Sequence, residues 1–244
     1  RPDGVTDGGW QGGRGMQVTA AALKDPTQSY LVLGDWFIEN AKALLDAPNE
    51  YYVEVSAADA ALGAAGAAVL YYWPNGTAST KSGAPSRDVT LVATQLKTLI
   101  SINASMGSPI RDVTIEGVTF RDAADVAMEP WGVPSGGDWG LHRGGAIFIE
   151  GCENCVVTEC TFTRLDGNAV FLSGYTRGAT VADSTFEWLG HSAVAAWGYT
   201  DEDDGTGGQQ PRGSEIVRNY VREIGLIKKQ SSAFFQAKRC ENNI

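Results

Sequence analysis

The chain has 244 residues, a formal net charge of −10 and 43 % hydrophobic residues, so it can bury one sizeable core. Its acidity argues against nucleic acid and anionic membranes as partners, because both bind basic surfaces. A polyanionic ligand would need a locally basic site, whereas neutral glycans and calcium suit an acidic surface. No stretch is long and apolar enough to insert into a membrane as a helix.

The N-terminal third predicts a short helix and two strands. Asp35 can cap the helix, and Pro48 ends it. The apolar stripe of this helix consists of Phe37, Ala41, Leu44 and Leu45. Strand-like segments follow at residues 51–55 and 69–73, on either side of an alanine-rich insertion. We interpret residues 1–85 as a leader that caps the rest of the chain.

Residues 86–244 contain an eight-residue pattern with a large apolar residue at its third and eighth positions. The copies run from Val89 to Leu96, Val113 to Phe120, Cys155 to Phe162, Ala179 to Phe186 and Ser214 to Val221. Their starts are 24, 42, 24 and 35 residues apart, which is a period of 24 with insertions of 18 and 11. The sixth position predicts an interior column of small or hydrogen-bonding side chains, in which a buried Asn must be paired. This column holds Thr94, Val118, Cys160, Ser184 and Asn219.

A second segment follows the first in four repeats, always with alanine at its third position. These alanines are Ala146, Ala169, Ala193 and Ala233. Short strands at a 24-residue period are typical of a parallel β-helix, an all-β solenoid in which like positions of successive turns stack. An antiparallel sandwich would give the alternation but not the repeating register. We therefore expect one buried line to contain Ile115, Val157, Val181 and Ile216.

Several runs of residues resemble a known family. They are Trp36-Phe37-Ile38-Glu39-Asn40, Leu45 to Tyr52, Leu70-Tyr71-Tyr72-Trp73-Pro74, Gly151-Cys152-Glu153-Asn154-Cys155 and Ile224 to Lys238. In these runs the chain is similar to secreted right-handed parallel β-helix proteins of the pectate-lyase-like superfamily, although Tyr51 stands where that family usually has tryptophan. The resemblance implies a right-handed helix, an extracellular location and a role with carbohydrate. It also implies further turns of the helix after Ile244.

Two sequons and four cysteines are relevant to the predicted extracellular location. Asn75 and Asn103 each begin an Asn-x-Ser/Thr triplet, which favours a secreted glycoprotein. The cysteines are Cys152, Cys155, Cys160 and Cys240. A zinc site would need a second paired motif, so we expect buried thiols or one disulfide, either between Cys152 and Cys155 or involving Cys240.

Substrate binding is predicted in the larger insertion, residues 121–143, because loops between repeats carry function on such a scaffold. Indole rings beside carboxylates suit sugars, since a pyranose packs on the ring and carboxylates accept hydroxyl protons. The candidate substrate-binding residues are Glu129, Trp131, Trp139, His142 and Arg143, together with Arg222 of a later turn. The alternative is that the two tryptophans only fold the loop over the side of the helix.

The turns that follow each eighth position bring charged side chains onto one predicted ridge. The catalytic candidates there are Asp122, Asp166, Glu187, His191 and Lys229. Two carboxylates could act as acid and base in glycoside hydrolysis. Alternatively, a Lys or Arg could abstract a proton beside a uronate carboxylate, with Arg222, Lys228 and Lys229 as the basic patch that a lyase needs. The non-catalytic interpretation is a ladder of surface ion pairs.

Metal binding has little support in the sequence. Asp201, Asp203 and Asp204 are weak calcium candidates, although consecutive acids usually form a solvated edge. His142 and His191 stand on different repeats, so we expect separate structural or surface roles, with satisfied side chains, and no shared metal. No other cofactor is expected.

The sequence supports two hypotheses about function. The first is an extracellular enzyme, a glycoside hydrolase or a polysaccharide lyase. The second is a non-catalytic structural or adhesive module of a glycan-rich assembly, which associates through the ends of its β-helix. In both, the partner is a polysaccharide or glycan, with no nucleic acid and no membrane insertion.

Overall fold

The computed structural model describes residues 41–55, 68–74, 90–126, 129–134, 140–200, 204–228, 230–237 and 240–244. The chain divides into two compact units, one within residues 18–92 and the other from Ala93 onward. The described part is all-β apart from one short 3₁₀-helix, η3 (Lys42–Leu44). None of its helices has the length and apolar character needed to cross a membrane.

The first unit contains a two-stranded antiparallel sheet, in which β1 (Tyr51–Val55) pairs with β2 (Ala68–Tyr72). Both predicted strands are confirmed within one residue. The predicted helix is wrong over its described part, where η3 is a single turn, and Asp35 and Phe37 lie outside the described residues. One Glu50 oxygen accepts the backbone N–H groups of Asp46 and Ala47 at 2.8 Å each, so these groups are not available to continue a helix.

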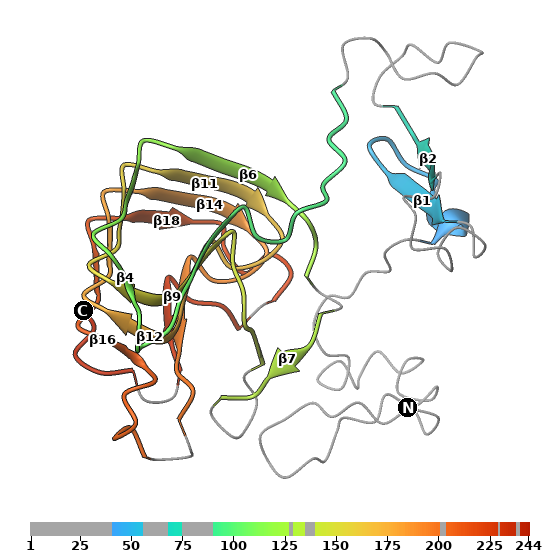
Figure 1. Ribbon diagram of the computed structural model, residues 1–244. Helices are drawn as coiled ribbons and strands as arrows, with labels where there is room; N and C mark the ends of the chain where they lie inside the picture. Colours follow the sequence, from blue (N-terminus) through green and yellow to red (C-terminus); the bar gives the residue numbers. More distant parts are fainter. Residues whose placement is uncertain are drawn as a thin grey trace, which may run out of the picture. The chain divides into compact units, whose positions relative to one another are not determined.

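The second unit contains three parallel sheets (Figure 1). Sheet I consists of β5 (Thr114–Glu116), β10 (Val156–Thr158), β13 (Thr180–Ala182) and β17 (Glu215–Val217). Sheet II consists of β6 (Thr119–Ala123), β11 (Thr161–Leu165), β14 (Thr185–Leu189) and β18 (Tyr220–Arg222). Sheet III consists of β3 (Ile100–Asn103), β9 (Ile147–Glu153), β12 (Val170–Arg177), β15 (Val194–Trp197) and β19 (Phe234–Gln236), with the short strands β4 (Ile110–Arg111) and β16 (Pro211–Arg212).

The chain visits sheets III, I and II in a fixed order and then returns to sheet III one strand further on. Val157 pairs with Ile115 on one side and Val181 on the other, and Val181 pairs with Ile216. The predicted line of four aliphatic side chains is therefore confirmed. Its central members, Val157 and Val181, are fully buried because they have neighbours on both sides.

A second interior column follows the eighth position of the pattern. The rings of Phe120 and Phe162 stack at 5.0 Å between centroids, and those of Phe162 and Phe186 stack at 4.7 Å. Val221 continues the register at the end of sheet II. Stacked aromatic rings exclude water from the interior over three successive repeats and add contacts between them.

The sixth position of the pattern forms the predicted hydrogen-bonded column in its last three copies. The backbone N–H of Cys160 donates to Ser184 Oγ at 3.1 Å, and the N–H of Ser184 donates to Asn219 Oδ1 at 3.0 Å. Asn219 Nδ2 donates in turn to the Val181 carbonyl at 2.8 Å. Each repeat thus satisfies a buried backbone group of the repeat before it.

Left-handed backbone conformations recur at three places in each repeat. The first column contains Asp112, Asn154, Gly178, Gly213 and Asn242, and the second contains Gly117, Glu159, Asp183 and Arg218. The third column, which we call the kink column, contains Asp122, Arg164, Trp188 and Glu223. All of these residues have positive φ; the first two columns lie where the chain turns between sheets, and the kink column bends the strands of sheet II near their ends.

The predicted first copy of the pattern, Val89 to Leu96, is wrong. Its described residues form no strand, and Leu91 and Leu96 are exposed. The strand that pairs with β9 is β3, a few residues further along, with Ile100 opposite Ile147. The Leu96 carbonyl accepts a hydrogen bond from Ala124, so the segment lies at the end of sheet II without joining it.

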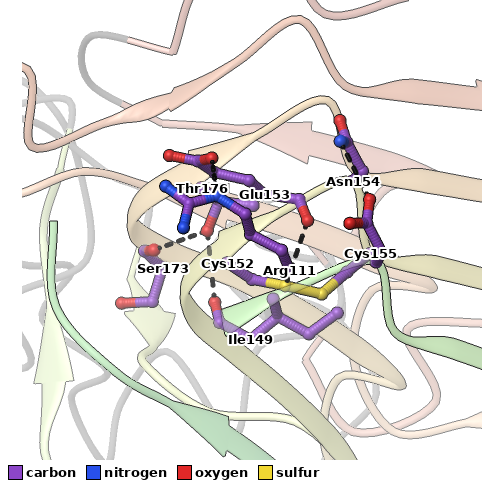
Figure 2. The surroundings of a disulfide bond; sticks show 9 residues. Arg111, Ile149, Cys152, Glu153, Asn154, Cys155, Ser173 and Thr176 are labelled. Atoms are coloured by element: carbon purple, nitrogen blue, oxygen red, sulfur yellow. Dashed lines mark hydrogen bonds and ion pairs between the residues drawn. A yellow bond between two sulfur atoms is a disulfide. The ribbon is translucent and has the colours of Figure 1, made fainter. Parts of the chain in front are cut away.

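Figure 2 shows the disulfide between Cys152 and Cys155, which spans the bend between β9 and β10. This pairing is one of the alternatives that the sequence left open. Arg111 and Glu153 form an ion pair of 2.7 Å beside it. Of the other cysteines, Cys160 is a buried thiol in the interior column, and Cys240 is half-buried.

Candidate functional site

The larger insertion folds as a small hairpin, in which β7 (Trp131–Gly132) pairs antiparallel with β8 (Leu141–His142). Trp131 is directly opposite His142. Trp139 lies outside the described residues, so its predicted role stays a prediction. The hairpin brings two of the predicted substrate-binding residues side by side.

The hairpin packs on the outer face of sheet III. Leu141 lies in an apolar cluster with Phe171, Ala195 and Phe235 of β12, β15 and β19. The indole of Trp197 lies directly against Gly132 and leaves no room there for a Cβ atom. The insertion therefore covers the side of the stack, as the non-catalytic interpretation of its tryptophans expected.

Four side chains from separate segments meet at the edge of this hairpin. We call Trp131, His142, His191 and Lys228 the aromatic–histidine cluster. The Trp131 ring lies 4.8 Å from the His191 ring and 6.2 Å from the His142 ring, measured between centroids. The ammonium of Lys228 lies 5.3 Å from the centre of the Trp131 ring, within cation–π range.

His191 is the buried member of the cluster. Only 1 % of its surface is exposed, and neither ring nitrogen has a hydrogen-bond partner among the described residues. Burial lowers the pKa of His191 to about 4, helped by the charges of His142 and Lys228 and opposed by Asp125. The imidazole is therefore neutral at neutral pH.

The expectation that the two histidines are separate is thus wrong, and the expectation of a satisfied side chain is wrong for His191 among the described residues. Their places in different repeats predicted a separation, but the hairpin carries His142 back across the stack to the same tryptophan as His191. His142 remains half-buried, with Nδ1 3.4 Å from the Pro130 carbonyl. Both imidazole rings therefore contact the same indole.

Two of the predicted catalytic carboxylates lie on sheet II in ion pairs. Asp122 accepts two bonds from Arg164, at 2.8 and 2.9 Å, and this contact holds the pKa of Asp122 below its ordinary value. Glu187 accepts two bonds from Arg222, at 2.7 and 2.9 Å. These pairs link successive repeats, so this part of the ridge matches the ion-pair interpretation.

The remaining described ridge and loop candidates are Asp166 and Glu129, and each lies near one histidine of the cluster. Asp166 is half-buried, and its backbone packs closely against Gly190, next to His191. Glu129 forms an ion pair with Lys97, whose hydrogen bond lowers the pKa of Glu129. Lys229 lies outside the described residues.

Arg143 is predicted to bind substrate, but its guanidinium is directed into the fold. It donates to Ser173 Oγ at 2.9 Å and to the carbonyls of Trp197 and Gly198 at 2.8 and 3.0 Å. The Trp197 and Tyr199 rings flank it at 4.2 and 4.1 Å. Burial lowers the pKa of Arg143, and these contacts hold β8 against sheet III.

The calcium and glycosylation candidates are described only in part. Asp201, Asp203 and Asn75 lie outside the described residues. Asp204 accepts the Thr206 N–H at 2.8 Å, which lowers the pKa of Asp204. Within the described ranges, no three His, Cys, Asp or Glu side chains are grouped to hold a metal ion. Asn103 is exposed at the end of β3.

No protein-family model, curated protein or solved structure matches the chain. The resemblance to secreted β-helix proteins therefore stays a prediction from the sequence. The interpretation of the site depends on the geometry alone.

Sequence reasoning missed two features of this region. It gave Trp188 no role, although this residue directly follows Glu187 on the predicted ridge. It also missed Trp197 and Tyr199 as partners of Arg143. Trp197 could have been found from the alternation of residues between the two faces of a sheet, which puts its side chain on the outer face of its strand.

Proposed function

We propose that the second unit is a right-handed parallel β-helix of the secreted, pectate-lyase-like kind. The support is the fixed order of the three parallel sheets and the 24-residue step from Val156 to its partner Thr180. Hydrogen-bonded and aromatic columns between repeats are the packing that such a solenoid needs. An extracellular location accords with the Cys152–Cys155 disulfide, since such bonds persist in oxidising compartments.

We further propose that the protein is an enzyme that acts on extracellular polysaccharide at the aromatic–histidine cluster. The observation that carries this proposal is the convergence of Trp131, His142 and Lys228 over the buried imidazole of His191, whose nitrogens have no hydrogen-bond partner within the described ranges. An indole offers a face for a pyranose ring, and the adjoining imidazole and ammonium supply proton transfer and positive charge. Perturbed titratable groups beside a binding surface are typical of active sites.

Lyase chemistry fits this cluster better than hydrolysis. Hydrolysis needs two cooperating carboxyl groups, and Asp122 and Glu187 are each bound to an arginine. In the lyase reaction Lys228 neutralises a uronate carboxylate, and His142 accepts the proton from the adjacent carbon. The electron pair of that C–H bond forms a C=C bond while the glycosidic C–O bond breaks. The leaving oxygen takes a proton from water.

The test is incubation with polygalacturonate, alginate and neutral glucans, followed by ultraviolet detection of unsaturated products. We expect product from a uronate polymer, and a fall of about 100-fold or more for His142→Gln and Lys228→Met. Arg218→Gln is the control, since it removes an exposed cation that is paired with Asp183. Product formation that survives both cluster substitutions would refute the assignment of this site.

A non-catalytic building block is the second candidate. An apolar cavity of about 240 Å³ lies at the last repeat, between β17, β18 and β19. It is lined by Phe186, Val194, Ile216, Val221 and Phe234, among others. Residues 241–244 already bond to the outer edge of β16 and β17, whereas β18 and β19 end their sheets, so a further chain could extend the ladders of sheets II and III. Sedimentation of long polymers that lack any lyase activity would favour this function over the first.

A further inference from the structure

Trp188 occupies an unusual backbone position. It lies in the kink column with a φ of +58°, between Arg164 at +51° and Glu223 at +48°. The other non-glycine residues with positive φ in the described part of the chain are Asn, Asp, Glu or Arg. A bulky aromatic residue is disfavoured in this conformation, because its Cβ crowds the neighbouring carbonyl.

Little packing compensates for this conformation. The indole is 45 % exposed, although it is the largest side chain of its column. Among the described residues, the guanidinium of Arg222 lies 5.7 Å from the centre of the indole ring. The repeat imposes positive φ at this position, so a large aromatic ring is held at the surface without being buried by its neighbours.

The flanking arginines are fixed and turned outward. Arg164 stands in the preceding repeat, held by Asp122, and Arg222 stands in the following repeat, held by Glu187. The two guanidinium side chains are 54 % and 46 % exposed, whereas their carboxylate partners are 16 % and 25 % exposed. An exposed flat ring thus has the oriented N–H donors of Arg222 beside it, and those of Arg164 come from the position in register with it in the preceding repeat.

We propose that Trp188, Arg164 and Arg222 form a glycan-binding subsite, in which a pyranose ring stacks on the indole and the arginines donate to its oxygens. This inference rests on the proposed action on polysaccharide and extends it to a second surface. His191 follows Trp188 by three residues, so the turn that carries the subsite leads directly to the aromatic–histidine cluster. Each arginine is paired with a carboxylate, so the subsite recognises the ring and hydroxyl groups more than net charge.

The test is calorimetric titration of the whole chain with hexamers of galacturonate and of β-1,4-linked glucose. Trp188→Asn should weaken the affinity about tenfold, because the stacking face is lost. Its melting temperature should stay within about 2 °C of the wild type or rise, because Asn tolerates positive φ. Glu159→Asn is the matched control at an exposed residue with a φ of +51° in another column, and it should leave the affinity unchanged.

Three results would overturn the subsite: unchanged affinity in Trp188→Asn, a melting temperature lowered by more than about 5 °C, or no binding of either hexamer by the wild type. A lowered melting temperature would show that the indole stabilises the fold by packing. Trp188-dependent binding without any unsaturated product would refute the proposed activity and leave the subsite intact. Cleavage together with binding that does not depend on Trp188 would refute the subsite and leave the proposed activity intact.

Discussion

His191 is buried beneath Trp131, with both ring nitrogens unpaired among the described residues. Its pKa of about 4 lies below the ordinary 6.5, so the unfolded chain binds the proton more tightly than the folded protein. Stability attributable to this residue is therefore complete above about pH 6.5 and is lost as the pH falls towards 4. The loss approaches about 3 kcal/mol if the whole shift is realised.

His191→Phe should remove this pH dependence. Phenylalanine fills a similar volume and leaves no unsatisfied nitrogen, so the free energy of unfolding at neutral pH should stay equal or rise. Urea unfolding at about pH 7 and about pH 5 measures the difference for both proteins. The same slope in the variant and the wild type would show that other groups cause the pH dependence.

Substitution of Asp122 is predicted to have little effect on stability. Its ion pair with Arg164 is largely solvent-exposed on the arginine side, so Asp122→Asn should cost no more than about 1 kcal/mol. At saturating polymer, unsaturated product should form at an unchanged rate, because Asp122 acts on the subsite through Arg164 and the cluster lies elsewhere. A large fall in rate with unchanged stability would restore Asp122 as the catalytic residue that the sequence suggested.

The site was only partly predictable at the scale of single residues. Trp131 and His142 were named because an insertion that carries indole and charged groups suits sugar binding. The meeting of His142 with His191 depends on how a hairpin folds back over the stack, and no local pattern specifies that path. Arg143 was assigned to substrate for its type, whereas its carbonyl partners come from β15, more than fifty residues away.

Among the elements, the interior column at the sixth position ties each repeat to the next. Ser184 is its central member, since its hydroxyl accepts from Cys160 N–H and donates to the Ala182 carbonyl. Ser184→Ala should lower the free energy of unfolding by about 1–3 kcal/mol, because it leaves a buried N–H without a partner. Ser101→Ala, at an exposed position of β3, is the control for thermal melting. Equal melting temperatures of the two variants would contradict the column.

The strands of the last four repeats were predictable, because their apolar third and eighth positions face the interior. The first copy failed because two apolar residues at the right spacing do not specify a strand without a neighbour in register. The left-handed columns were not predicted, since residues such as Arg164 and Trp188 carry no signal for positive φ. The backbone path of the whole repeat imposes that conformation on them.

For the molecule as a whole, surface charges contribute less to stability than the apolar core does. The ion pairs between repeats lie on exposed surfaces, where each is worth about 0–1 kcal/mol. The net charge of −10 adds self-repulsion, which salt screens. The melting temperature should therefore stay level or rise slightly as NaCl increases to about 1 M. A fall of more than about 5 °C in calorimetry would show that the ion pairs, and not the apolar columns, hold the stack together.

The central claim is that a glycan binds at the aromatic–histidine cluster. The chain has two histidines, and both belong to this cluster, so imidazole resonances in nitrogen-15 NMR report on it alone. Titration with a galacturonate hexamer should move the signals of His142 and His191 together, and Lys228→Met should abolish the shift. Signals that stay in place at saturating hexamer would contradict the account.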